Sequence, residues 1–77
     1  MTIYDAIHDV LQEAKDPYAR AYAQAALDSE MKGEELRVQV LYILSNLGYW
    51  RGEVARDVKK VLKEFTKAKA NEVHKFN

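Results

Sequence analysis

The chain has 77 residues, twelve of them basic and twelve acidic, with one proline, three glycines and no cysteine. This length predicts a single domain over residues 1–77, and the lack of cysteine excludes disulfides, thiolate metal sites and cysteine nucleophiles. No window approaches the roughly 18 consecutive apolar residues of a membrane span, and the first residues lack the pattern of a secretory leader. We therefore expect a soluble, cytoplasmic protein without a membrane partner.

A first helix is predicted over about residues 3–14. Thr2 followed by Asp5 is a weak capping box, in which each side chain bonds the main chain of the other residue. Apolar residues then recur at three- and four-residue spacing and line one helical face. They are Ile3, Ile7, Val10, Leu11 and Ala14. An acidic stripe of Asp5, Asp9 and Glu13 lies on the opposite face.

A second helix is predicted over about 17–31. Asp16 suits the N-cap, and Pro17 suits the first helical position because its missing N–H has no partner there in any helix. The expected inner face is Tyr18, Ala21, Tyr22, Ala25 and Ala26. We expect Gly33 to take the left-handed conformation that closes the helix, and Glu34 and Glu35 to open the next one.

Two further helices are predicted at about 34–47 and 50–69. Leu36, Val40, Ile43, Leu44 and Leu47 line one face of the third helix, and Val38, Leu41 and Tyr42 extend its apolar surface. Val54, Val58, Val61, Leu62 and Phe65 line the fourth. Residues 70–77 have weak periodicity and are expected to fray. The fold class is therefore all-α, a small bundle of about four helices that could also form a helical homo-oligomer.

An alternative joins the last two helices into one rod. Apolar positions step by three or four residues from 36 to 65 without a break. An interior glycine costs only about 1 kcal/mol relative to alanine, which packing can override. A rod would need a partner to cover so long a seam, so we favour the four-helix arrangement.

The stretch "LGYWRGE" joins these two helices and holds the one tryptophan. On a helical projection Trp50 falls beside the apolar stripe of the fourth helix, which places it at a corner of the core, and Tyr49 falls on the far side. Gly48 is expected to end the third helix and Gly52 to leave space where the helices diverge. Tyr49, Trp50 and Arg51 are also the residue types enriched at binding hot spots, so they are candidate partner-binding residues.

The segment "LYILSNLGYWRGEVARDVKKVLKEF" resembles part of a group of small, uncharacterised helical proteins encoded in tailed-phage and prophage genomes. The similarity covers about a third of the chain. It implies a phage or prophage origin and, with it, the cytoplasm of a host cell. It implies no catalytic or binding role for any residue.

Charge is unevenly distributed along the chain. Residues 1–50 hold four basic and eight acidic residues, and residues 51–77 hold eight basic and four acidic, so the halves carry −4 and +4. Five cations of the fourth helix share its outer face as a basic ridge: Arg56, Lys59, Lys60, Lys63 and Lys67. The ridge is either a face for an anionic partner or a solvated surface whose cations pair with Glu53, Asp57 and Glu64.

No chemistry-bearing motif stands out. Asp5, His8, Asp9 and Gln12 share a face, but they lack convergent ligands, so we expect no metal. No phosphate loop or nucleophile elbow is present, and we expect neither a cofactor nor an enzyme. The sequence favours a protein-binding module that self-associates or binds a phage or host protein, with the acidic stripe and the basic ridge setting orientation. The alternative is an auxiliary nucleic-acid-binding protein that uses the basic ridge.

Overall fold

Four helices make up the described part of the chain. The computed structural model describes the backbone of residues 1–75 and the side chains of residues 1–67. The helices are α1 (Ile3–Glu13), α2 (Pro17–Asp28), α3 (Gly33–Ser45) and α4 (Glu53–Lys75), and this part of the chain contains no strand. The predicted all-α class and the number of helices are confirmed.

The first two helices begin at the predicted local signals. Thr2 and Asp5 form a complete capping box, with Asp5 N–H donating to Thr2 Oγ1 at 3.1 Å and Thr2 N–H donating to Asp5 Oδ2 at 3.0 Å. Asp16 Oδ1 accepts from the N–H groups of Tyr18 and Ala19, and Pro17 follows the cap. These bonds satisfy main-chain donors that a helix start leaves without partners.

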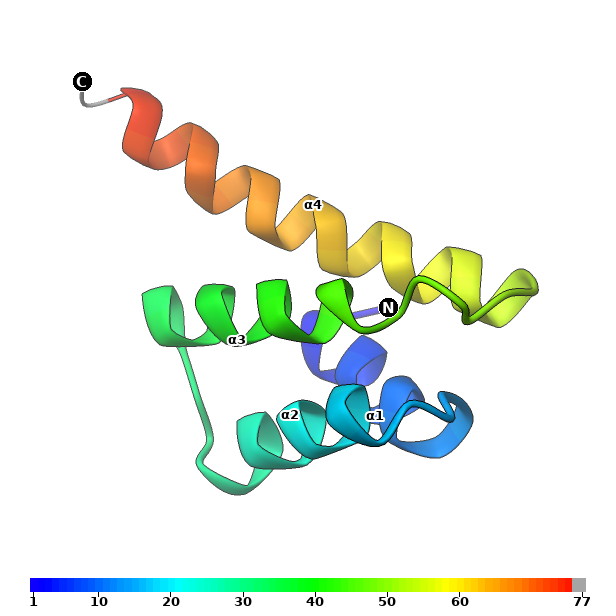
Figure 1. Cartoon of the computed structure of the whole chain (residues 1–77). Coiled ribbons are helices and arrows are strands. Elements are labelled where there is room, and N and C mark those ends of the chain that lie inside the picture. Colours follow the sequence, from blue (N-terminus) through cyan, green and yellow to red (C-terminus); the bar gives the residue numbers. More distant parts are fainter. Residues whose placement is uncertain (76–77) are drawn as a thin grey trace.

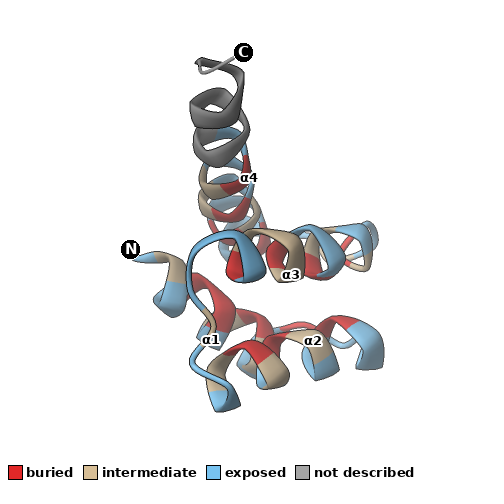
Figure 2. Ribbon diagram, turned by 90° about the vertical axis from the view of Figure 1, so that its left-hand side faces the viewer, coloured by how far each residue is buried: buried red, intermediate tan, exposed pale blue. Residues whose placement is uncertain are grey.

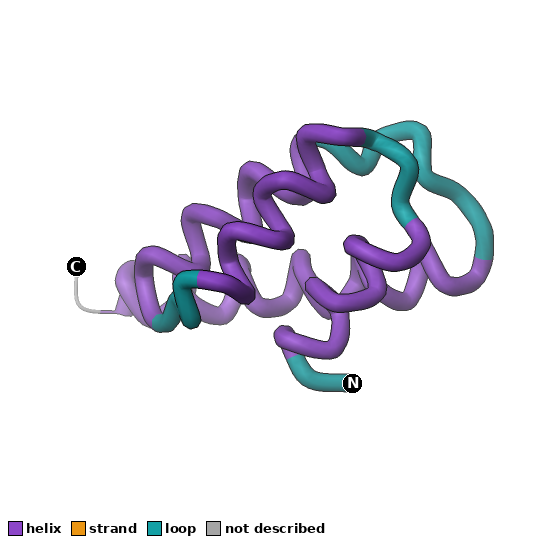
Figure 3. Tube along the Cα trace, turned by 90° about the horizontal axis from the view of Figure 1, so that it is seen from below, coloured by secondary structure: helices purple, strands orange, loops and turns teal. Residues whose placement is uncertain are grey.

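The helices form a closed ring of contacts. α1 packs against α2 and α4, and α3 packs against the same two helices. Figure 1 shows α3 between α2 and α4, and Figure 3 shows that the α1–α2 and α3–α4 connections lie at the same end of the bundle. Two side-chain contacts add to the packing of α2 against α3. The rings of Tyr22 and Tyr42 stack with centroids 5.4 Å apart, and Gln39 Nε2 donates a hydrogen bond to Tyr22 O at 2.9 Å.

The core lies where the helices face one another (Figure 2). The expected faces of α1 and α3 are confirmed, since Ile7, Val10, Val40 and Ile43 are fully buried. The buried residues of the core are Ala6, Ile7, Val10, Ala14, Ala19, Ala23, Ala26, Leu36, Val40, Ile43, Leu47, Val58 and Leu62.

The predicted inner face of α2 was wrong in part. Ala19, Ala23 and Ala26 are fully buried, whereas Tyr18 is 67% exposed and Ala21 is exposed. Tyr22 and Ala25 are half-buried. Small side chains let neighbouring helices approach closely, and a tyrosine at the centre of the contact would hold them apart.

Helix α2 ends earlier than predicted, and a different residue closes it. Glu30, with φ +50°, takes the left-handed conformation that we expected at Gly33. Met31 N–H donates to Ala26 O and Glu30 N–H to Leu27 O, which is the bond pair of a Schellman motif. Gly33 also has positive φ, at +57°, but it lies at the start of α3.

The connection between α3 and α4 is a bend, so the rod alternative is wrong. Helix α3 ends at Ser45 and α4 begins at Glu53, and the two helices pack against each other. Trp50 therefore precedes α4 and is not part of it.

Gly52 has φ +112°, a backbone conformation that residues with a side chain rarely adopt. A Cβ at this position would meet nothing within 4 Å. Glycine is therefore required here by the backbone conformation, and not, as predicted, by a need for space between diverging helices. Gly48 has no positive φ, and Asn46 caps α3 in its place.

Helix α4 continues to Lys75, past its expected end at Lys69. The predicted fraying of 70–77 falls on residues whose side chains lie outside the described set, and it stays a prediction. Within the described residues, no helix combines the length and apolar character needed to cross a bilayer.

Candidate functional site

The α3–α4 connection is fixed at both ends. Leu47, which is 1% exposed, anchors it in the core, and Trp50 N–H donates to Leu47 O at 3.1 Å. From the other side, Lys59 Nζ donates to Trp50 O at 2.6 Å. Trp50 is half-buried and packs against the core, as predicted for a core corner. These contacts give the adjacent Tyr49 and Arg51 defined positions.

Tyr49 lies on the far side, as predicted, and it is 97% exposed. It lies at the edge of a pocket of about 440 Å³ at the end of the bundle, which we call the end pocket. The end pocket forms because the α1–α2 and α3–α4 connections lie at the same end of the bundle. Its lining residues are Glu13, Ala14, Lys15, Asp16, Asn46, Leu47, Tyr49, Trp50 and Arg51.

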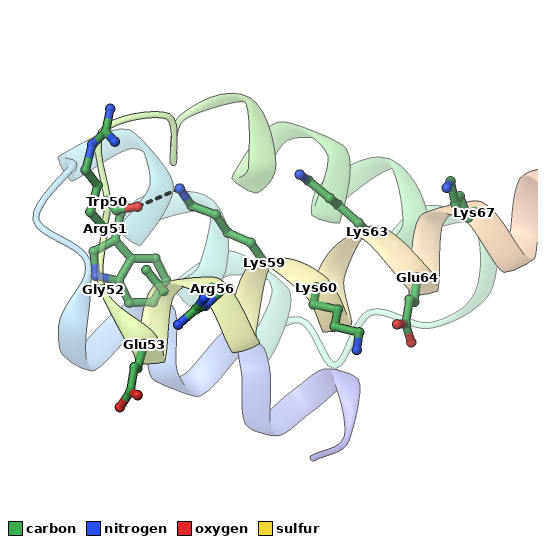
Figure 4. A pocket seen from close by; sticks show the side chains of 11 residues that line it. Trp50, Arg51, Gly52, Glu53, Arg56, Lys59, Lys60, Lys63, Glu64 and Lys67 are labelled. Atoms are coloured by element: carbon green, nitrogen blue, oxygen red, sulfur yellow. Dashed lines mark hydrogen bonds between the residues drawn. The ribbon is translucent and has the colours of Figure 1, made fainter.

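A second hollow follows the outer surface of α4. This basic groove has a volume of about 870 Å³, and Figure 4 shows the side chains that line it. It holds all five residues of the predicted basic ridge and adds Arg51 and Trp50 at one end. The other lining residues are Gly52, Glu53, Ala55 and Glu64. Tyr49 does not line this groove, so the exposed tyrosine belongs to the end pocket alone.

No cation of the basic groove forms a salt bridge with a described side chain. Among residues 1–67 the one salt bridge joins Arg37 to Glu34 on α3. Glu53, Asp57 and Glu64 stand at helical spacing from the groove cations but form no salt bridge with them in this part of the chain. The expected pairing that would make the ridge an internally neutralised surface is therefore absent from the described side chains.

Lys59 lies near two other cations of the groove, Arg51 and Lys63. Burial lowers the pKa of Lys59, and the nearby charges of Lys63 and Arg51 lower it further. Its hydrogen bond to Trp50 O directs the ammonium group toward the connection (Figure 4). Lys63 and Lys67 follow Lys59 at four-residue intervals and extend on the same side of α4.

The predicted site residues thus fall on two adjoining surfaces that share Trp50 and Arg51. Among the polar residues that complete the end pocket, Glu13 was predicted only as part of the acidic stripe, and the sequence did not indicate Lys15 or Asn46. They come from elements distant in sequence. Asp16 carried a signal, but for capping α2.

One residue on the polar face of α1 has a structural role. Asp5 belongs to the capping box, and hydrogen bonding with Thr2, through its main chain first and its side chain second, lowers the pKa of Asp5. The described side chains contain no group of three or more His, Cys, Asp or Glu placed to hold a metal ion.

Comparisons of the chain with protein-family models, with curated proteins and with solved structures found no match.

Proposed function

We propose that the protein is a non-enzymatic protein-binding module of phage or prophage origin that acts in the cytoplasm of the host. Its contact surface is the end pocket with Tyr49, Trp50 and Arg51, and its partner is a second copy or another phage or host protein. The observation that carries the proposal is the 97% exposure of Tyr49 beside a half-buried tryptophan and an arginine.

The arrangement has the composition of an interface centre. Trp, Tyr and Arg are enriched among residues that dominate binding energy, and hot spots cluster in pockets surrounded by polar residues. Here the aromatic residues lie beside Leu47 and Ala14, and the polar rim comes from Glu13, Lys15, Asp16 and Asn46. Tyr49 is free to insert into a partner because it contributes nothing to the core.

The bonds around the connection favour a preformed site. Because Leu47 is buried and Lys59 holds Trp50 O, the main chain beside Tyr49 is fixed before any partner arrives. A preorganised contact loses less conformational freedom on binding. Ser45, at the end of α3, lies outside the pocket, and its hydroxyl donates to Tyr42 O at 2.8 Å.

Site-specific photocrosslinking tests this proposal. A benzophenone amino acid replaces Tyr49 in one variant and Tyr18, which is 67% exposed, in a matched control. In bacterial cells we expect a discrete adduct from position 49 and none from position 18. An adduct of twice the chain mass identifies a second copy as partner. The adduct should weaken in an Arg51→Ala background, and equal labelling from both positions would contradict the proposal.

Sedimentation at several protein concentrations provides the solution test for a second copy. If the end pocket joins two copies, Tyr49→Ala shifts the monomer–dimer equilibrium toward monomer, while Tyr18→Ala leaves it unchanged. Truncating a central aromatic anchor typically costs about 2 kcal/mol or more, roughly a 30-fold change in the dissociation constant.

A further inference from the structure

We propose that the basic groove binds single-stranded nucleic acid, with Lys63 and Lys67 contacting phosphates and Trp50 offering a stacking surface for a base. This site adjoins the end pocket and shares Trp50 and Arg51 with it, but it does not depend on the protein-binding proposal. Three features of the groove support this: its excess of positive charge, the regular spacing of its lysines and the placement of the tryptophan.

The first observation is charge. Six cations line the groove: Arg51, Arg56, Lys59, Lys60, Lys63 and Lys67. Two carboxylates, Glu53 and Glu64, accompany them, and no salt bridge joins any of these groups in residues 1–67. Like charges at four-residue spacing destabilise a helix, so Lys59, Lys63 and Lys67 oppose the formation of α4. A polyanion in the groove would remove this repulsion.

The second observation is spacing. Lys59, Lys63 and Lys67 recur every four residues, a step of about 6 Å along a helix at 1.5 Å per residue. A nucleic-acid strand carries one phosphate charge per nucleotide, at regular intervals along its backbone. A regular line of cations on this scale suits a regular chain of anions. Lys59 is already bonded to Trp50 O, which leaves five cations for phosphate contact.

The third observation is the tryptophan. Trp50 is half-buried, packs against the core on one side and lines the groove, where its indole lies at one end of the row of cations (Figure 4). Proteins that bind single strands without sequence preference combine a positive groove with aromatic rings on which bases stack. In a duplex the bases are already stacked on one another, so they are less accessible to this ring.

An acidic protein segment is the competing ligand. Tyr49, the most exposed aromatic side chain among residues 1–67, lies outside the groove. The groove itself is lined mainly by long charged side chains. Protein interfaces instead deplete lysine at their centres. The observations therefore favour phosphates over carboxylates, and the experiment includes both.

The experiment measures fluorescence anisotropy of a labelled oligothymidine of about 15 nucleotides, within the range of known single-strand sites. On a single strand, each phosphate contact contributes about −0.7 to the slope of log Ka against log salt concentration. Contacts from five cations should therefore give a slope of about −3.5. Trp50 is the one tryptophan of the chain and lines the groove, so its emission should change on binding.

Two double variants isolate the groove. Lys63→Gln with Lys67→Gln should reduce the slope by about 1.4 and weaken binding about 25-fold at 0.1 M salt. Arg20→Gln with Lys32→Gln removes the same charge elsewhere on the surface and should leave binding nearly unchanged. All four residues are exposed, and circular dichroism verifies helix content.

Several results would overturn the proposal. They are no binding at the lowest salt, equal losses in both double variants, and tighter binding of a duplex of the same length. More effective competition by polyglutamate than by unlabelled oligothymidine would assign the groove to an acidic protein instead.

Discussion

The ammonium group of Lys59 lies 2.6 Å from the carbonyl oxygen of Trp50 and joins the second turn of α4 to the connection that precedes the helix. The two residues are nine positions apart, and this bond places Trp50 between the end pocket and the basic groove. Both proposed surfaces therefore depend on the geometry of residues 46–52.

Lys59 predicts a pH dependence of stability. Its pKa in the folded protein is lowered below the ordinary 10.5, because burial and then Lys63 and Arg51 disfavour its charge. Between the two pKa values the unfolded chain binds more protons, so the free energy of unfolding rises with pH through this window. Urea unfolding from neutral pH to 10.5 should show wild type gaining stability relative to Lys59→Met. A difference in unfolding free energy between wild type and Lys59→Met that stays constant with pH would contradict this. Lys60→Met, which changes an exposed neighbouring lysine, is the control and should show no such pH dependence.

Gly52 and Gly48 form a matched pair. Gly52→Ala should lower the free energy of unfolding by about 1–3 kcal/mol, because φ +112° strains any residue with a Cβ. Gly48→Ala should be neutral or stabilising by about 0.5 kcal/mol, since its φ is not positive and its surroundings are open. Chemical denaturation of both variants checks this, and equal effects would be evidence against the described bend.

Glu30→Gly should stabilise the protein by about 1 kcal/mol, because glycine adopts φ +50° without the penalty that other residues incur. Glu64→Gly, in the middle of α4, removes the same side chain and should instead destabilise by about 1 kcal/mol. Thermal unfolding of the two variants should therefore shift in opposite directions. A loss of stability in both would show that residue 30 is not left-handed.

The capping box of α1 predicts an acid-dependent contribution. The folded-state pKa of Asp5 is lowered below 3.8, so its stabilising effect is present above that pH and is lost as the pH falls through the folded-state value. The free energy of unfolding of wild type should therefore exceed that of Asp5→Asn near neutral pH, and this difference should shrink as the pH falls. Thr2→Ala removes the capping hydroxyl but keeps the main-chain N–H that donates to Asp5. It should cost about 1 kcal/mol near neutral pH and should remove only part of the acid dependence. Urea titrations of the three proteins supply the comparison.

The sequence predicted helix starts best where a local signal exists. Thr2 with Asp5 and Asp16 with Pro17 act within three residues, so their geometry follows from the sequence alone. The end of α2 had no such signal, because glutamate at position 30 does not indicate a left-handed residue.

Orientation and side-chain contacts were harder to predict. Helix α2 is rich in alanine, so several of its faces look equally apolar, and only packing shows that Ala19 and Ala23 face inward while Tyr18 does not. The Lys59–Trp50 bond and the meeting of Glu13 with Tyr49 in one pocket depend on how the chain bends between α3 and α4. The basic ridge was predictable because all five of its residues lie on one helix.

The bend at residues 46–52 is tested most directly by one distance. Because the chain has no cysteine, spin labels at Glu35→Cys and Lys67→Cys attach only at the far ends of the α3 and α4 contact. Pulsed dipolar spectroscopy, on labelled protein diluted with unlabelled protein, should give a distance well under half of the roughly 48 Å that a continuous helix would place between them. A distribution centred near 48 Å would contradict the fold and both surfaces built on it.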